Sequence, residues 1–331
     1  MNKTKISAKI VADSVSPQGD RLISVLCTFP RIILSEVNTH RMLSKNTSSS
    51  RAIPFTKMVE SVQNDPFIPI AWQKDHKGMQ GTEYLVDRKH ENAVYEWLKA
   101  RDFAVKQANI MNSDGVTKQL ANRLLEPFMW TTMLITGSKE GWDNFFNLRC
   151  PSYFGKWKSW KETCAATGTI FEAPLLERLH NNKGQAEIHI MELAEQVYDA
   201  MNESTPKQLE AGQWHIPMRN KIDNDILLDT LEDGNFINDK IENYLVKIST
   251  AMAARTSYTV VGDEKEIDYS KMVELHDRLI SQNPPHSSPM EHACQAVTDE
   301  EYNNSFKGEE KGWFRNYKGF KSYRQVIEES K

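Results

Sequence analysis

The run RLISVLCTF (21–29) is the feature that most narrows what this chain can fold into. It alternates in polarity and is rich in β-branched residues, which is typical of a strand. Pro30 suits the first position of a helix. Ile33, Val37 and His40 then recur at helical spacing on one face. A strand that leads directly into a helix predicts a fold that mixes a sheet with helices.

A dense polar segment, NTHRMLSKNTSSSRAIP (38–54), begins on the last turn of this helix. It combines a histidine and several cations with many amide and hydroxyl side chains, so its hydrogen-bonding capacity is high. Residues 44–50 have no apolar period, and we expect them to form a loop that Pro54 closes. A solvated loop needs no special reason for such a composition, so the segment gains meaning only from the rest of the chain.

Further apolar periods predict helices around a sheet. PFMWTTMLIT (127–136) is expected to be a buried strand and HACQAV (292–297) a short one. Helices are expected, with Pro127 ending the third, at 55–63, 83–112, 117–125, 139–149, 186–201, 241–254 and 270–282. Residues 150–184 show no clear period and are interpreted as an insertion. We therefore expect one α/β (α+β) domain over residues 1–331, with a mostly antiparallel or mixed sheet flanked by helices.

Composition and charge exclude some classes of function. A hydrophobic content of 39% and a charged content of 26% are those of an ordinary globular protein, and a formal net charge of -4 offers no broad surface for nucleic acid. The sequence has neither a signal-like N-terminus nor an apolar run of membrane-spanning length, so we expect a cytoplasmic protein. The four cysteines are scattered and are expected to be buried thiols: Cys27, Cys150, Cys164 and Cys294.

Polar side chains that can carry chemistry fall into three groups. In chain order they are His40, Arg41, Ser44, Asn46, Ser49 and Arg51; then Arg123, Asn144 and Arg149; then ARTSY (254–258) with HSSPMEH (286–292). Clustered arginines beside hydroxyls and amides suit a phosphate or another small polyanion, because guanidinium groups bind such oxygens bidentately. No group has the ligand spacing of a metal site, and we expect no metal.

The first group resembles the signature of the flavin-dependent thymidylate synthases (ThyX), which reads R-H-R, seven residues of any kind, then S. His40 and Arg41 match the last two letters of R-H-R, and Ser49 falls on the serine. Thr39 stands where the first arginine is expected. The other motifs of the family are resembled by NRLLEP, WDNFFNLR, ARTSY and HSSPMEH.

The order of these segments departs from the usual family arrangement. There, the segments similar to ARTSY and HSSPMEH precede the histidine-arginine signature, whereas here they lie at 254–292. The chain is therefore interpreted as circularly rearranged, a change that folds tolerate when the joined ends are close and exposed. It is similar to phage-type members that share THR, a GMQ like that around Met79, and a G-x-x-x-Y-R like Gly319 to Arg324.

The resemblance implies an enzyme that binds FAD, reduces it with NADPH, and transfers a methylene from methylenetetrahydrofolate to carbon 5 of dUMP to give dTMP. It implies FAD contacts from His40, Arg41, Asn46, Asn144, Ser257, His286, Ser288 and Glu291. It implies dUMP contacts from Ser49, Ser50, Arg51, Arg123 and Arg149, of which Ser49 and Arg149 serve catalysis, the serine as a positioning hydroxyl and not a nucleophile. It also implies a homotetramer whose sites draw on several subunits.

Plainer roles compete with these assignments. His40 would also suit a cap of the helix C-terminus, Arg149 a structural ion pair, and Glu291 a pair with the adjacent histidine. The family pattern also places an arginine near Glu140 and an asparagine near Ser138, which this sequence lacks.

Two other functions stay open at this point. A dUMP hydroxymethylase of the same family would share the dUMP and flavin motifs. A different class is a single-stranded nucleic-acid-binding protein that uses KWKSWK (156–161), because interleaved aromatics and cations can grip single strands. The acidic net charge speaks against this second reading.

Overall fold

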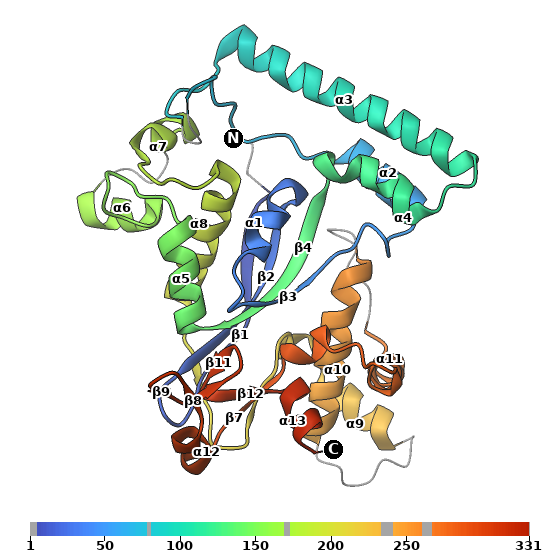
Figure 1. The fold of residues 1–331 in the computed structure, drawn as a ribbon, viewed down its shortest axis with the longest axis vertical. Coiled ribbons are helices and arrows are strands. Elements are labelled where there is room, and N and C mark those ends of the chain that lie inside the picture. The colour runs from blue at the N-terminus through green and yellow to red at the C-terminus, as the bar shows by residue number, and fades with distance from the viewer. Residues whose placement is uncertain (1–4, 78–80, 169–172, 233–240, 260–266, 331) are drawn as a thin grey trace.

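A computed structural model describes residues 5–77, 81–168, 173–232, 241–259 and 267–330 (Figure 1). Met79 and parts of the 150–184 insertion lie outside the described residues. Figure 1 shows a central sheet with α5 and α8 on its left, α2, α3 and α4 above and to its right, and the elements from α9 to α13 below. None of the described helices is both long and apolar enough to cross a membrane.

The central sheet is mixed, as the sequence predicts. It has five strands in the order β3-β4-β2-β1-β5, of which only the β1–β5 pair is parallel. The strands are β1 (Ser7–Val15), β2 (Arg21–Pro30), β3 (Ser44–Thr47), β4 (Trp130–Ser138) and β5 (Lys207–Gln208).

Short strands in the C-terminal third form three small sheets. A three-stranded sheet contains β6 (Trp214–His215), β7 (Cys294–Ala296) and β12 (Phe320–Ser322). Two hairpins pair β8 (Phe306–Lys307) with β9 (Glu310–Lys311) and β10 (Trp313–Phe314) with β11 (Tyr317–Lys318). Because β11 also contacts β2 and β4, this late part of the chain lies against the central sheet.

The helices follow the predicted apolar periods closely. In the first half they are η1 (Arg31–Ile33), α1 (Leu34–Asn38), α2 (Phe55–Asn64), α3 (Asp87–Ser113), α4 (Lys118–Ala121), η2 (Asn122–Phe128) and α5 (Lys139–Arg149). In the second half they are α6 (Trp160–Thr167), α7 (Leu175–Asn181), α8 (Ile188–Glu203), η3 (Arg219–Lys221), α9 (Asn224–Glu232), α10 (Ile241–Arg255), η4 (Thr256–Tyr258), α11 (Tyr269–Ser281), η5 (Ser288–Glu291), α12 (Asp299–Asn304) and α13 (Tyr323–Glu329).

The largest core cluster lies between the central sheet and the helices α5 and α8. Trp142, Phe145 and Phe146 point from α5 into this core, which stabilises the helix that carries Arg149. Gly137 on β4 lies directly beneath the turn before β3, because an added Cβ there would be 2.4 Å from the Leu43 side chain. The close approach of this turn to β4 therefore requires a glycine.

Three local expectations are wrong. Residues 44–47 form strand β3 and not a loop, because β4 supplies backbone partners that no apolar period announces. Pro30 ends strand β2 and precedes the helix η1 instead of opening it. Pro127 lies inside η2, where the short 3-10 helix continues to Phe128.

The cysteines and the KWKSWK segment can now be placed. Cys27, Cys150 and Cys294 are buried free thiols, whereas Cys164 is half-buried. Within KWKSWK, Trp160 is buried and packs on Tyr153. Lys158 donates a hydrogen bond to Asn147 over 2.7 Å, so neither of these two side chains presents a free binding surface.

Candidate functional site

Strand β3 joins the polar segment to the C-terminal part of the chain. Ser44 Oγ donates a hydrogen bond to Glu291 Oε2 over 2.8 Å. Arg324 Nη1 donates to the other carboxylate oxygen of Glu291 over 2.7 Å. The Glu291 carboxylate therefore links β3, η5 and α13, which come from three distant parts of the sequence. It does not pair with the adjacent histidine.

Asn46, also on β3, makes a second connection to the same region. Its Nδ2 donates to the carbonyl of Ala253 over 2.8 Å, and its Oδ1 accepts from Ser288 Oγ over 2.8 Å. Just beyond the strand, the amide of Ser49 donates to the carbonyl of Ser257 over 3.0 Å. The 44–49 segment is thus bonded directly to both of the later motifs, ARTSY and HSSPMEH.

His40 lies at the other end of the polar segment and contacts α5. Its Nε2 accepts a hydrogen bond from Arg149 Nε over 3.0 Å, and its ring meets Phe145 edge to face at 4.9 Å. Burial, helped by the charges of Arg149 and Lys45, lowers the pKa of His40 to about 4. The imidazole is therefore neutral near pH 7, as an acceptor from a guanidinium must be.

Lys45, and not His40, caps the end of α1. Its Nζ donates to the carbonyl of His40 over 2.6 Å and lies 3.4 Å from that of Val37. Burial lowers the pKa of Lys45 to about 8. Arg149 also approaches Glu36, with 3.7 Å between Nη1 and Oε2, so it takes part in the expected ion pair as well as in the bond to His40.

The Glu126 carboxylate on η2 contacts two of the residues that are predicted to bind an anion, Ser50 and Arg123. Its Oε1 accepts from Ser50 Oγ over 2.6 Å and from Arg123 Nη1 over 2.9 Å. Arg31 Nε lies 3.3 Å from the same oxygen. Arg51 is exposed next to this cluster in the sequence. Two arginines therefore share one carboxylate, which leaves the cluster cationic.

Several predicted site residues are exposed and are not tied down. Arg41, Arg51, Asn144 and His286 make no side-chain hydrogen bond to any other residue that the structure describes. These side chains are free to take a ligand. By contrast, the side chains of Asn46, Ser288 and Glu291 already make hydrogen bonds to other parts of the protein.

Lys318 of β11 supplies a cation that sequence reasoning missed. Its backbone amide donates to Ser138 Oγ over 2.8 Å, and its Nζ lies 3.7 Å from Glu140 and 3.9 Å from Asp20. The family pattern places an asparagine near Ser138 and an arginine near Glu140, and this sequence has neither. No local signal could have paired them with a lysine 180 residues later.

A row of hydroxyls crosses the sheet beneath Glu291. Ser24, Thr136 and Ser44 lie opposite one another in register on β2, β4 and β3, so they share one face. Ser24 Oγ is 2.6 Å from Thr136 Oγ1, and two histidines extend the chain of hydrogen bonds: His215 Nε2 lies 2.8 Å from Ser24 and His292 Nδ1 lies 2.8 Å from Thr136.

Both histidines of this row are neutral. Burial lowers the pKa of His215 and of His292 to about 3. His215 Nδ1 is 2.9 Å from Ser14 Oγ, whereas the buried Nε2 of His292 has no partner among the described residues. Each member has one proton to donate to the next, so the row can run in one direction or the other along its whole length.

The donor set fits an anionic, ring-bearing cofactor such as FAD only in part. Arg41, Asn144 and His286 offer free donors for phosphate and carbonyl oxygens. Asn46, Ser288 and Glu291 instead form a frame, in which each side chain is hydrogen-bonded to another part of the protein. The described residues contain no cluster of histidine, cysteine and carboxylate side chains able to hold a metal ion.

No protein-family model and no curated protein matches this chain. Solved structures resemble part of it. The UMP/dUMP methylase PolB from Streptomyces cacaoi, bound with 5-Br dUMP, is 12% identical, covers 61% of this chain and 92% of its own, and has a TM-score of 0.44. The flavin-dependent thymidylate synthase ThyX from Helicobacter pylori, complexed with FAD and dUMP, is 17% identical, covers 54% of this chain and 67% of its own, and has a TM-score of 0.29.

Proposed function

We propose that this chain is a flavin-dependent enzyme that modifies carbon 5 of dUMP, a thymidylate synthase of the ThyX type with a rearranged segment order. The observation that supports the proposal most is the direct bonding of the motif-bearing segments. Ser44 binds Glu291, Asn46 binds Ser288, and the Ser49 amide binds the Ser257 carbonyl. Segments that resemble separate motifs of one family thus share one place in the fold.

The rearranged order has a simple physical counterpart in this proposal. Ser44 and Asn46 of strand β3 take their hydrogen-bond partners from residues 253–291, which follow the strand in the chain. The bonds depend on where the segments lie in space and not on which is made first. One domain over residues 1–331 can therefore keep the same site with its segments in either order.

In this proposal FAD is held by the exposed donors Arg41, Asn144 and His286, against the frame of Asn46, Ser288 and Glu291. FAD, when bound and reduced with NADPH, supplies the hydride that completes the transferred methylene. Ser44 and Arg324 hold the Glu291 carboxylate from both sides, so it keeps one orientation. Because this carboxylate is already ordered, ligand binding loses no further conformational entropy at Glu291.

The proposed dUMP site is the cationic cluster at Glu126 together with the serines before it. Arg51 and Arg123 bind the phosphate and the Ser49 hydroxyl positions the nucleotide, whereas the expected contact from Ser50 is replaced by its buried hydrogen bond to Glu126. Ser49 Oγ already accepts from the Arg51 amide over 3.3 Å, which fixes the turn between them. Among the described residues, no base is hydrogen-bonded to the Ser49 hydroxyl, so its role is to orient and not to attack.

Arg149 is proposed as the cation near the reacting pyrimidine. Neutral His40 accepts from its Nε and thereby sets the plane of the guanidinium. The guanidinium then stabilises negative charge that develops on the pyrimidine ring. His40 therefore acts through Arg149 in this proposal, in addition to any contact with the cofactor.

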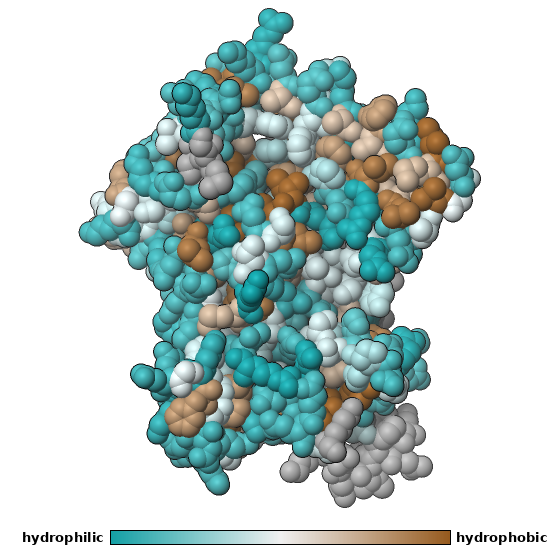
Figure 2. Space-filling view, in the orientation of Figure 1, coloured by the Kyte–Doolittle hydropathy of each residue, from teal (hydrophilic) through white to brown (hydrophobic). Residues whose placement is uncertain are grey.

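A homotetramer is part of the proposal and has a candidate surface on α3. Tyr95, Phe103 and Ile110 are exposed by 61%, 64% and 45% and lie about two helical turns apart on one face. Hydrophobic surface gathers in the upper right of Figure 2, where Figure 1 places α3 and α4. Exposed apolar side chains that gather on one face of a helix mark contact surfaces.

Two alternatives remain distinguishable by experiment. A dUMP hydroxymethylase would use the same residues and differ only in the product. The nucleic-acid-binding alternative predicts salt-sensitive binding of single-stranded oligonucleotides; within KWKSWK, Trp160 is buried and Lys158 is bonded to Asn147, whereas Lys156 is exposed.

The test is to purify the full chain, record its flavin absorbance, and assay release of tritium from carbon 5 of dUMP with NADPH and methylenetetrahydrofolate. Mass spectrometry of the nucleotide product separates dTMP from hydroxymethyl-dUMP. A protein that binds no FAD and releases no tritium from dUMP would refute the proposal.

A further inference from the structure

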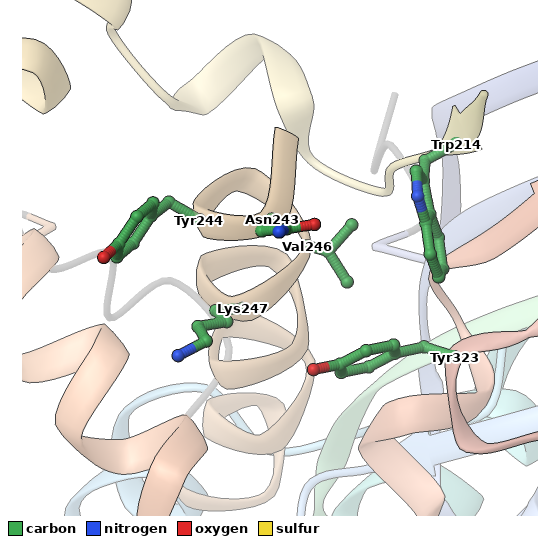
Figure 3. A pocket seen from close by; sticks show the side chains of 6 residues that line it. All are labelled: Trp214, Asn243, Tyr244, Val246, Lys247 and Tyr323. Atoms are coloured by element: carbon green, nitrogen blue, oxygen red, sulfur yellow. The ribbon is translucent and has the colours of Figure 1, made fainter. Parts of the chain in front are cut away.

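A cavity of about 240 Å³ lies between β6, α10 and the start of α13, apart from the residues of the proposed site. Figure 3 shows its lining, with Trp214 facing α10 across the opening, Val246 between them and Tyr323 below. Drug-sized ligands occupy cavities of roughly 300 Å³ or more, so this one suits a single small ring system.

Two aromatic walls shape the cavity. The rings of Trp214 and Tyr323 lie 5.7 Å apart with their planes at 79°, so they meet nearly at a right angle. Val246 adds a buried aliphatic surface. A flat ring can stack on one wall while its edge meets the other, which is the arrangement that aromatic groups prefer.

The contacts of the Tyr323 hydroxyl leave its oxygen able to accept a hydrogen bond from a ligand. His276 Nδ1 lies 2.8 Å from Asp277 Oδ1, and His276 Nε2 lies 3.1 Å from the Tyr323 oxygen. The carboxylate only accepts, so the proton of the neutral imidazole is on Nδ1. Nε2 must then accept from the Tyr323 hydroxyl. The lone pairs of the phenol oxygen stay available for an N–H group of a ligand.

Lys247 and Asn243 supply the complementary donors. Lys247 lines the cavity, and its Nζ lies 3.2 Å from Asp277 Oδ1, which compensates its charge. Asn243 is exposed, and its amide makes no hydrogen bond to another residue that the structure describes. A ligand edge with an N–H next to a C=O would match the Tyr323 oxygen on one side and these donors on the other.

We propose that this cavity is a second binding site, which takes a planar heterocycle with a ring N–H next to a carbonyl, the edge found in hypoxanthine, guanine and uracil. The site also adjoins the frame described above, because Tyr323 is followed by Arg324, the partner of Glu291. The proposal does not depend on the reaction proposed for the chain.

Titration calorimetry of the full chain with inosine and with adenosine tests this inference. Inosine presents its N–H to the Tyr323 oxygen and its C=O to the donors, whereas adenosine in the same pose presents a bare ring nitrogen to the Tyr323 oxygen and an amino group to the donors. We expect inosine to bind about tenfold more tightly than adenosine, the factor for one well-placed hydrogen bond. Tyr323→Phe keeps the ring and should weaken inosine binding about tenfold, and Asn243→Ala should weaken it severalfold.

Matched controls separate this site from the proposed dUMP site. Tyr95→Phe on α3 and Arg51→Ala should leave inosine binding unchanged. If inosine does not bind at about 1 mM, a weak-affinity limit, or binds no better than adenosine, or binds Tyr323→Phe as tightly as the unmodified chain, the inference is overturned. A chain that turns over dUMP but does not bind inosine would reject this site alone. A chain that binds inosine but does not turn over dUMP would reject only the proposed function.

Discussion

Arg149 donates a hydrogen bond to His40 across 3.0 Å, and this bond ties the end of α5 to the turn that leads into β3. The histidine accepts because burial lowers its pKa to about 4. Protonation would place two cations against each other. The connection between the helix and the strand is therefore intact only while His40 is neutral.

Acid should weaken the fold through His40. Its pKa falls from 6.5 in the unfolded chain to about 4 in the folded one, so below about pH 6.5 the unfolded chain binds the extra proton first. The free energy of unfolding should then fall as the pH falls from about 6.5 to about 4, by up to about 1.4 kcal/mol per pH unit for each such group. Urea unfolding at a series of pH values measures this slope.

A variant separates His40 from the other buried histidines, His215 and His292, whose lowered pKa values act in the same direction. His40→Gln keeps an acceptor for Arg149 but does not titrate, so its slope should be shallower. His286→Gln, at an exposed position, should keep the original slope. Identical slopes for all three proteins would contradict the account of His40.

Removing the Arg324 side of the frame should reduce flavin binding. Arg324→Met leaves the Glu291 carboxylate with Ser44 as its remaining side-chain partner among the described residues, so the carboxylate loses its fixed orientation. The pair is partly exposed, so the free energy of unfolding should change by about 1 kcal/mol or less. Flavin absorbance per protein after gel filtration should fall severalfold. Lys321→Met is the control. Lys321 lies on β12, directly before α13, and pairs with Glu301, so this variant should retain its flavin.

Arg51 should affect the substrate and not the fold. It is exposed and its side chain has no hydrogen bond to the described residues, so Arg51→Ala should change the free energy of unfolding by less than about 0.5 kcal/mol. The loss of a charge-assisted bond to phosphate should raise KM for dUMP about tenfold or more. Arg88→Ala on α3 is the matched exposed control. Equal KM values for the two variants would remove Arg51 from the proposed site.

Replacement of Thr136 should lower the free energy of unfolding. Thr136→Val keeps the shape and the strand preference but leaves Ser24 and His292 without their common partner in a buried place. The free energy of unfolding should fall by about 1–3 kcal/mol. Thr132→Val, on the same strand but half-buried and without a recorded side-chain hydrogen bond, should cost much less. Denaturant midpoints of the two variants that coincide would show that the hydroxyl row adds nothing to stability.

Elements that bury apolar side chains at a regular period could be predicted from the sequence. The strand at 21–29 and the helix at 139–149 are examples, because Val25 and Cys27 alternate inward and Trp142 and Phe145 line one helical face. Strand β3 could not be found in this way. Its four residues, Ser44 to Thr47, are all polar, and they are extended because the backbone of β4 lies beside them.

Site residues that belong to a family motif could be predicted from the sequence. Residues that gain a role only through contact with a distant residue could not. The sequence grouped Ser49, Ser257 and Ser288 into motifs that the structure joins through β3. Lys318 and His215 belong to no group, since each is an ordinary residue locally and acquires a role only from a contact far away in the chain. Contacts of this kind are set by packing and leave no local signal.

The location of the partners of β3 has a consequence for synthesis. A ribosome releases Ser44 and Asn46 long before their hydrogen-bond partners Ala253, Ser288 and Glu291, and before Arg324, which holds the Glu291 carboxylate. A nascent chain halted near residue 250 would carry Ser44 and Asn46 without these partners, and loading of any cofactor onto this frame must wait until translation has passed Arg324.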